Sequence, residues 1–395
     1  MDNNFVLDLS DLSGEMRLLL DIMSAEGKDI GRSPGRKTDF RGIDWDLFLQ
    51  LVIHHRVYPC IYTTLKNMEE RQVPGRVLEA LHHLYKRNAY EMLYLSGEME
   101  QVSRLAANEQ IRALFLKGPV LADYLYGDLS LRSSMDLDLL IQSCDLYKME
   151  RLLVQLGYEK DDYIQSVLSD WKWRHHHITF LHPKKGIKLE IHWRLNPGPG
   201  KEPSFHQFWE RKALSPLTNH PVYMLGREDL FLFLITHGAR HGWSRLRWLE
   251  DIRRLVKQPL DWKRLHLLLK SYQYVHVGGQ ALILASELLN TRVTAEMKGL
   301  LKPRSRQLAQ DAVFYIKEMV NLHTPPLPEH VARHHQRHLF SLMSGQQKLL
   351  FISSFLYPYH EDAETLPLPK KLHFLYFPLR PVLWAWRKTK KRAFS

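Results

Sequence analysis

The sequence has little cysteine and no long apolar run, and each absence removes a class of protein. Its two cysteines, Cys60 and Cys144, provide neither a disulfide framework nor a cysteine zinc site, so a cytoplasmic location is expected. No stretch approaches the ~18 uninterrupted apolar residues of a transmembrane helix. The first residues, 1–4, are polar and acidic, so no signal peptide is expected.

The sequence also lacks a basic track along its body. Its formal charge is +12, yet eight cations lie in a closing segment without acidic residues: Lys370, Lys371, Arg380, Arg387, Lys388, Lys390, Lys391 and Arg392. The rest of the chain carries a formal charge of only +4. Because nucleic-acid binding needs an electropositive surface on the folded body, this distribution disfavours nucleic acid as a partner.

The stretch from residue 135 to 141 is typical of a short buried strand, but it carries two carboxylates. Side chains alternate along a strand, so Asp136 and Asp138 share one face while Leu137 and Leu139 share the other. Burying two like charges is costly unless a cation lies between them. The pair therefore indicates either a divalent metal ion or an exposed strand end.

Two neighbouring segments extend this pattern. Residues 187–194 alternate in the same way and place Glu190 on the polar face of a second strand. Upstream, an apolar strand at residues 111–116 leads through Lys117, Gly118 and a proline into a helical pattern. Proline suits the first turn of a helix, and the free N–H groups of that turn can bind an anion.

Taken in order, these motifs resemble the uncharacterised bacterial nucleotidyltransferases of the polymerase-beta-like superfamily. The resemblance rests on Lys117-Gly118, Leu125-Tyr126, Arg132, residues 136–140, residues 189–193 and residues 237–251. One position departs from the pattern, because the usual glycine-serine pair is here Gly118-Pro119. No hydroxyl at residue 119 can hold a phosphate, although Lys117, Ser133 or Ser134 could compensate.

The resemblance implies an α+β fold with a small mixed β-sheet flanked by helices and a mainly helical C-terminal half. Residues 1–108 are expected to form a helical region on the catalytic domain, and residues 109–200 the nucleotidyltransferase core, which ends at a Pro-Gly-Pro-Gly break. Residues 201–324 are expected to form a helical domain that completes the active-site cleft. Residues 325–395 would then form a helical extension with a basic aromatic tail.

The resemblance also implies a set of site residues. Asp136, Asp138 and Glu190 are expected to be catalytic and to hold Mg²⁺ or Mn²⁺, which prefer hard oxygen ligands. The residues expected to bind the nucleoside triphosphate are Lys117, Gly118, Arg132, Ser134, Trp193, His241, Arg245 and Arg247. Tyr126 and Trp243 are further candidates for stacking on the base.

The expected activity is transfer of a nucleoside monophosphate from a triphosphate to a hydroxyl or phosphate of a small molecule or peptide. In the family that the sequence resembles, such genes are often found in bacterial biosynthetic clusters. One alternative is nucleotidylation of a polynucleotide or a protein. Another is a non-catalytic nucleotide-binding scaffold, which the three intact carboxylates disfavour.

Two histidine-rich stretches raise the question of a transition-metal site. In a strand, two of His175, His176 and His177 could share the face that bears Glu190, but zinc normally needs three or four convergent ligands. Without cysteines, a zinc site is disfavoured here. The histidines of residues 330–338 are expected to lie on a solvated helix face.

The end of the chain mixes aromatic residues with its cations. Phe374, Trp384 and Trp386 beside lysine and arginine are typical of an interfacial membrane anchor. Pro378 and Pro381 are expected to prevent one long continuous helix. The competing interpretations are a tail wrapped over the body and a tail that binds an acidic partner.

Overall fold

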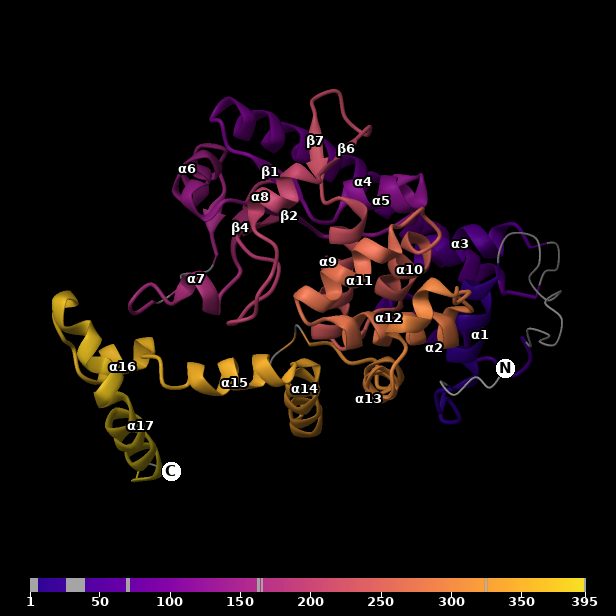
Figure 1. Cartoon of the computed structure of the whole chain (residues 1–395). Coiled ribbons are helices and arrows are strands. Elements are labelled where there is room, and N and C mark those ends of the chain that lie inside the picture. The colour runs from indigo at the N-terminus through magenta and orange to yellow at the C-terminus, as the bar shows by residue number, and fades with distance from the viewer. Residues whose placement is uncertain are drawn as a thin grey trace.

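A computed structural model describes residues 6–25, 40–68, 72–161, 164, 166–322, 324 and 326–393; the polar start at residues 1–4 lies outside them. Within these residues the chain forms one seven-stranded sheet and many helices, which confirms the expected α+β class (Figure 1). The strands are β1 (Ala113–Phe115), β2 (Asp136–Ile141), β3 (Glu159–Lys160), β4 (His177–His182), β5 (Ile187–His192), β6 (Ala213–Ser215) and β7 (Val222–Met224).

The sheet is mixed and has the order β3-β4-β5-β2-β1-β7-β6. At its centre β2 runs parallel to β5 and antiparallel to β1. The register of β2 and β5 pairs Asp138 with Glu190 and Leu140 with His192. Neighbouring strand residues in register point to the same face, so this pairing brings the polar side chains of the two strands together.

Helices on the N-terminal side support this sheet. They are α1 (Gly14–Ser24), α2 (Trp45–His54), α3 (Tyr58–Lys66) and α4 (Gly75–Asn108). The long helix α4 contacts β1, β2 and β7. It buries one stripe, including Met92, Met99 and Val102, at the spacing of an amphipathic helix. Burial of this stripe against the sheet holds the strands that carry the carboxylates.

The remaining helices surround the sheet or follow it. Those near the sheet are α5 (Pro119–Tyr126), α6 (Leu146–Gln155), α7 (Trp171–Arg174) and α8 (Phe205–Glu210). The helical half contains α9 (Arg227–Arg240), α10 (Leu246–Leu255), α11 (Trp262–Ser271), α12 (Val275–Leu289) and α13 (Pro303–Lys317). Short 3-10 segments are η1 (Leu129–Leu131), η2 (Ser143–Asp145), η3 (Glu296–Leu300) and η4 (Lys370–Leu375). Because β6 and β7 pair with β1, the sheet extends beyond residue 200.

The C-terminal segment forms an arm that leads away from the body, shown in orange to yellow in Figure 1. It contains α14 (Glu329–Leu342), α15 (Gly345–Ser354), α16 (His360–Thr365) and α17 (Tyr376–Ala393). Arg174 at the end of α7 ties the arm to the catalytic sheet, because it donates to the carbonyls of Tyr357 and Pro358 and lies 3.8 Å from the ring centre of Tyr359.

The expectation that two prolines would interrupt the tail was wrong. Helix α17 runs through both, because Pro378 lies in its first turn, where no backbone donor is needed. Pro381 then removes a single internal hydrogen bond. Two of the eight tail cations share one anion, since fully buried Asp362 lies 2.5 Å from Arg380 and 2.7 Å from Arg387.

The expectation that the histidines of α14 lie on one solvated face was also wrong. His338 is 1% exposed, and its Nε2 lies 2.9 Å from the carbonyl oxygen of Ala239 in α9. His335 lies 3.0 Å from the hydroxyl of Tyr315 in α13. None of the helices in the described part combines the length and apolarity needed to span a bilayer.

Candidate active site

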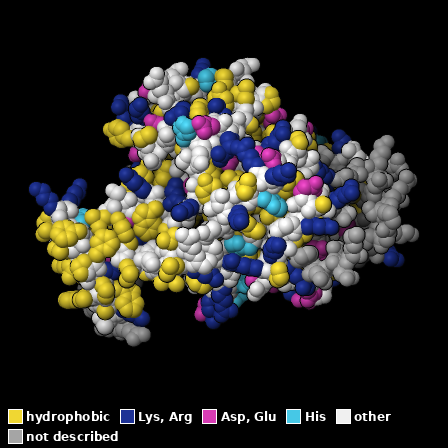
Figure 2. Space-filling model, in the orientation of Figure 1, with side chains coloured by type: hydrophobic (Ala, Val, Ile, Leu, Met, Phe, Trp, Pro, Cys, Tyr) yellow, Lys and Arg dark blue, Asp and Glu magenta, His cyan; other side chains and the backbone are white. Residues whose placement is uncertain are grey.

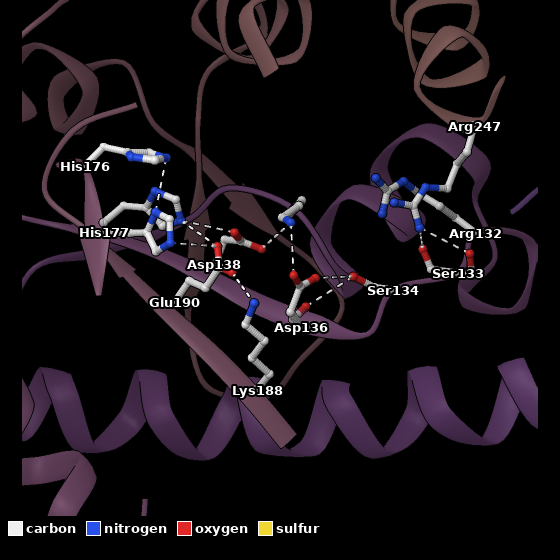
Figure 3. A network of polar contacts seen from close by, with 12 residues as sticks. Arg132, Ser133, Ser134, Asp136, Asp138, His176, His177, Lys188, Glu190 and Arg247 are labelled. Atoms are coloured by element: carbon white, nitrogen blue, oxygen red, sulfur yellow. Dashed lines mark hydrogen bonds and ion pairs between the residues drawn. The ribbon is translucent and has the colours of Figure 1, made fainter. Parts of the chain in front are cut away.

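The three carboxylates of β2 and β5 gather around the side chain of Lys117. Its Nζ lies 3.3 Å from Asp136 Oδ2 and 3.0 Å from Asp138 Oδ2. Lys188 covers the third carboxylate, with Nζ 2.7 Å from Glu190 Oε1. The close-up in Figure 3 shows Asp136, Asp138 and Glu190 along one face of the adjacent strands. A lysine thus supplies the positive charge that buried carboxylates need.

The carboxyl groups respond differently to this environment. Burial alone would raise the pKa of Asp136, but the charge of Lys117 brings it below its ordinary value. Burial dominates at Asp138 and raises its pKa, against the attraction of Lys117. Burial opposes ionisation at Glu190 too, yet the hydrogen bond from His192 and the charge of Lys117 hold its pKa well below the usual range. Asp136 and Glu190 are therefore ionised at neutral pH, beside the ammonium groups of Lys117 and Lys188.

Histidines lie on one side of the carboxylates. His192 Nε2 lies 3.1 Å from Asp138 Oδ1 and 3.4 Å from Glu190 Oε2. His177 Nε2 lies 4.0 Å from Glu190 Oε2, and His177 Nδ1 lies 3.1 Å from His176 Nε2. Figure 3 shows His176 and His177 beside Glu190, on the side away from Ser134. Imidazole and carboxylate groups therefore meet at one edge of the cluster.

Two groups of three side chains here could hold a metal ion: His176 with His177 and His192, and Asp138 with Glu190 and His192. Within each group the ligand atoms lie within 4.8 Å of one another. Oδ2 of Asp138 is buried and lies 3.0 Å from the ammonium of Lys117, so a cation already occupies the position beside this oxygen. The donor set fits a divalent cation that accepts both oxygen and imidazole ligands.

The histidines differ in protonation. Burial lowers the pKa of His177 to about 4, and the neighbouring His192 adds to the effect. Burial also opposes protonation of His192, but its hydrogen bonds to Asp138 and Glu190 raise its pKa above the ordinary value. His177 is consequently neutral at pH 7, which is the form that binds metals.

The turn before α5 requires glycine. Gly118 has φ +83°, and a Cβ there would lie 3.5 Å from the carbonyl oxygen of Asp136. The same Cβ would lie 3.9 Å from Ser134 Oγ, so the hydroxyl of Ser134 lies beside the glycine turn. Ser134 Oγ donates to the carbonyl oxygen of Asp136 at 3.2 Å. A hydroxyl is therefore present at this turn although residue 119 is proline.

Arg132 lies in a buried ion pair. Its Nε and Nη2 donate to the two carboxylate oxygens of Asp251, each at 2.9 Å. The hydroxyl of Tyr126 donates to Asp251 Oδ1 at 2.8 Å. Both Arg132 and Tyr126, expected near the nucleotide, are thus engaged with α10. Their contact fixes the helical half against the catalytic sheet.

The other residues of the helical half that were expected to bind the triphosphate make different contacts. Arg247 Nη1 donates to the carbonyl of Ser133 and to its Oγ, the latter at 3.2 Å, next to Ser134. Arg245 donates to His54 at 2.7 Å and thus faces α2. The ring of His241 lies against His237 and Trp248, with ring centres 4.7 and 5.4 Å away.

The expected stacking residues are packed inside the protein. Trp193 is 8% exposed, packs edge-on against Trp171 and donates from Nε1 to the carbonyl of Lys172. Trp243 is fully buried against Gly238, where an added Cβ would lie 2.3 Å from its ring. Stacking of Trp243 on a base would therefore require this packing to open.

The expected site did not include Lys188, His192 or Arg240, which lie near the carboxylates. His192 follows Glu190 by two positions, so the strand period already placed it on the same face. Arg240, at the end of α9, donates from Nη1 to His176 Nε2 at 2.7 Å. No local pattern joins Arg240 to a strand more than sixty residues earlier, so only the folded chain reveals this contact.

A mixed sheet that presents three carboxylates beside a glycine turn defines a transferase of the nucleotidyltransferase type. The chain belongs to a family described as uncharacterised nucleotidyltransferase, whose model matches residues 41–290. This match confirms the resemblance noted in the sequence, whereas the bacterial origin stays a prediction. No curated protein and no solved structure matched the chain in parallel comparisons.

Proposed function

We propose that this nucleotidyltransferase uses Mg²⁺ or Mn²⁺ to transfer a nucleoside monophosphate from a triphosphate to a hydroxyl or phosphate of a small molecule or peptide, as one step of a biosynthetic pathway. The convergence of Asp136, Asp138 and Glu190 carries this proposal. Such a cluster binds cations, and phosphoryl transfer depends on positioning and charge stabilisation more than on covalent chemistry.

The residues around the cluster suggest a division of roles. Asp136, Asp138 and Glu190 would hold the metal ions, which stabilise negative charge on the phosphates and activate the acceptor oxygen. Gly118 and Ser134 would bind the triphosphate at the first turn of α5. Lys117 would contact phosphate oxygens once its ammonium leaves the carboxylates.

Two observations support a small acceptor over the alternatives. A scaffold without activity has no need to bury three carboxylates at one site, because such a cluster costs stability. A polynucleotide acceptor would require a basic surface beside the site, and Arg245 and Arg247, which were expected to bind the triphosphate, are only 7% and 6% exposed. These arguments favour an acceptor small enough to enter the protein.

The test is mass spectrometry of acceptor mixtures after incubation with each triphosphate and either metal ion. A mass gain of one nucleoside monophosphate, with release of pyrophosphate, is the expected result. The Asp138→Asn variant should form no product, whereas Asp161→Asn, at an exposed position outside the cluster, should match the unaltered protein. Triphosphate binding without metal dependence would contradict the proposal.

We also propose a cytoplasmic location and peripheral contact between the arm and an anionic membrane surface. Both cysteines are free thiols. The arm exposes Phe374, Trp384 and Trp386, and Figure 2 shows a broad hydrophobic area over this part of the molecule. Lys388 lies 4.8 Å from the ring centre of Trp384, so cation and aromatic ring occur together, as at a membrane interface.

A further inference from the structure

A cavity of about 930 Å³ opens beside the histidine edge of the carboxylate cluster. His176 and His177 line it from the catalytic sheet, and Arg240 lines it from α9. His177 also lies 4.0 Å from Glu190, so the cavity and the carboxylates are separated by a single side chain. Its size is that of a site for a small organic molecule.

The wall farther from the carboxylates is mainly apolar. Side chains from α7, α12 and the arm line it, among them Trp173, Val277, Leu339, Leu342 and Phe351. Three segments of the chain thus contribute to one apolar space. An apolar ligand body would be favoured there, because burying it removes apolar surface from water.

Arg240 brings a positive charge to this cavity. Its Nη1 donates to His176 at 2.7 Å, while Nε is buried and has no hydrogen-bond partner in the described part of the chain. Burial lowers the pKa of Arg240 to about 10 against the attraction of Glu190 and Asp138, which still leaves the guanidinium charged at pH 7. Because the partly exposed guanidinium forms no ion pair with a described residue, an anionic ligand would gain a charge-assisted hydrogen bond from it.

The cavity lies on the acceptor side of the cluster. Gly118 and Ser134, which would bind the triphosphate, adjoin Asp136. His176 and His177 adjoin Glu190 instead, and Figure 3 shows these groups on opposite sides of Asp138. A molecule in the cavity would therefore approach the α-phosphorus from the side opposite the triphosphate turn, as in-line transfer requires.

We propose that this cavity is the acceptor site, and that the acceptor is an amphiphile whose apolar body fills the cavity and whose phosphate or carboxylate binds Arg240. This inference rests on the proposed function; it excludes a hydroxyl acceptor and extends the acceptor class from a phosphate to a carboxylate. The oxyanion is the nucleophile.

Nucleotidyl transfer to such an acceptor needs no general base. One oxyanion oxygen forms a bond to the α-phosphorus, and the bond from that phosphorus to the oxygen bridging the β-phosphate breaks. The electron pair leaves with pyrophosphate, and the product is an anhydride. No proton has to be removed from the acceptor. Glu190, which already contacts Lys188 and His192, is therefore not needed as a base.

Isothermal titration calorimetry with three probes of equal chain length tests this site: octyl phosphate, octanoate and octanol. The phosphate and the carboxylate should bind at one site, at least tenfold more tightly than the alcohol. Arg240→Gln should lower the affinity for the two anions at least tenfold and leave the affinity for octanol unchanged. Arg240→Lys should restore part of the binding, and circular dichroism establishes that each variant folds.

A second test fills the cavity with a larger side chain. Leu339→Trp, within the wall, should weaken binding of all three probes. Leu349→Trp, at a position 64% exposed on α15, should weaken binding of none of them. Equal binding of octanol and octyl phosphate, or an unchanged affinity in Arg240→Gln, would overturn the proposal. If Leu339→Trp weakens ATP binding as much as it weakens binding of the octyl probes, the proposal is also overturned, because the cavity would then hold the nucleoside.

The same titrations separate this inference from the proposed function. If the unaltered protein shows no metal-dependent binding of any of the four triphosphates, nucleotidyl transfer itself is refuted, and this is measured without any octyl probe. Normal binding of a triphosphate with no anion binding in the cavity would refute the acceptor site alone.

Discussion

The ammonium of Lys117 lies 3.0 Å from a carboxylate oxygen of Asp138, inside the cluster where metal ions are expected. The side chains of Lys117 and Asp138 are 13% and 2% exposed, so water screens their attraction poorly. Lysine and a divalent cation would therefore compete for the same oxygen. In the metal-free protein, Lys117 has a structural role as well as the expected role in phosphate binding.

The first prediction concerns this double role. Lys117→Met should destabilise the metal-free protein by about 3 kcal/mol, because buried carboxylates lose their neutralising partner. Saturating Mn²⁺ should recover much of that loss. Denaturant unfolding in EDTA and in Mn²⁺ measures both values, and Lys188→Met is the matched control. Because Lys188 is 44% exposed, its removal should cost less than about 1 kcal/mol. An equal loss with and without Mn²⁺ would contradict this role of Lys117.

The second prediction concerns the carboxylates. Asp136→Asn, Asp138→Asn and Glu190→Gln should each lower turnover by roughly 10²-fold or more, since each removes charge at the site of phosphoryl transfer. Their shapes are conserved, and relief of like-charge repulsion should keep the melting temperature close to that of the unaltered protein. Calorimetric melting checks this expectation. A large loss of melting temperature in all three variants would indicate structural carboxylates.

The third prediction concerns the choice of metal. His192 lies within hydrogen-bonding distance of Asp138, so an ion bound there should prefer Mn²⁺ over Mg²⁺. His192→Gln should weaken Mn²⁺ binding by about 10-fold to 100-fold, and Mg²⁺ binding less. Electron paramagnetic resonance of Mn²⁺ gives the affinity and reveals nitrogen ligands directly. His175→Gln, at an exposed neighbouring position, should leave both affinities unchanged. Equal effects on the two ions would mean that the imidazole is not a ligand.

The fourth prediction concerns pH. Burial lowers the pKa of His338 to about 4, so the unfolded chain binds a proton that the folded chain resists. The stability that depends on neutral His338 is present above pH 6.5 and is lost as pH falls through about 4. The loss amounts to about 3 kcal/mol over this window. His338→Gln should flatten the pH dependence of unfolding, whereas His206→Gln, at an exposed position, should not. An unchanged slope in His338→Gln would show that other groups govern acid unfolding.

The fifth prediction concerns the arm. Replacing Trp384 and Trp386 with serine should weaken sedimentation with phosphatidylglycerol vesicles by roughly tenfold or more, because two exposed rings no longer enter the interface. Tyr90→Ser, also exposed but on α4, should have no effect. Truncation after residue 368 is a poorer test, since it removes fully buried Tyr376. Equal sedimentation of all forms, or binding to neutral vesicles alone, would contradict the membrane proposal.

Local regularities made much of the catalytic strand pair predictable. The alternation around Asp136 and Glu190 is a property of a few consecutive residues, and burial of the intervening leucines orients both strands. The turn at Gly118 is equally local, because its backbone conformation strongly favours glycine. By contrast, Arg380 of α17 pairs with buried Asp362, which lies 18 residues earlier, and no short window of sequence reveals this contact.

The sequence by itself therefore determined the shared face of the carboxylates, which follows from the period of two along each strand, and its resemblance to a family implied the fold class. Only the tertiary structure decided what surrounds them. The pair of Arg132 and Asp251 spans 119 residues, and the contact of Arg240 with His176 spans 64. Such contacts depend on how whole elements pack and on which rotamers remain possible after packing, and neither is encoded in local spacing.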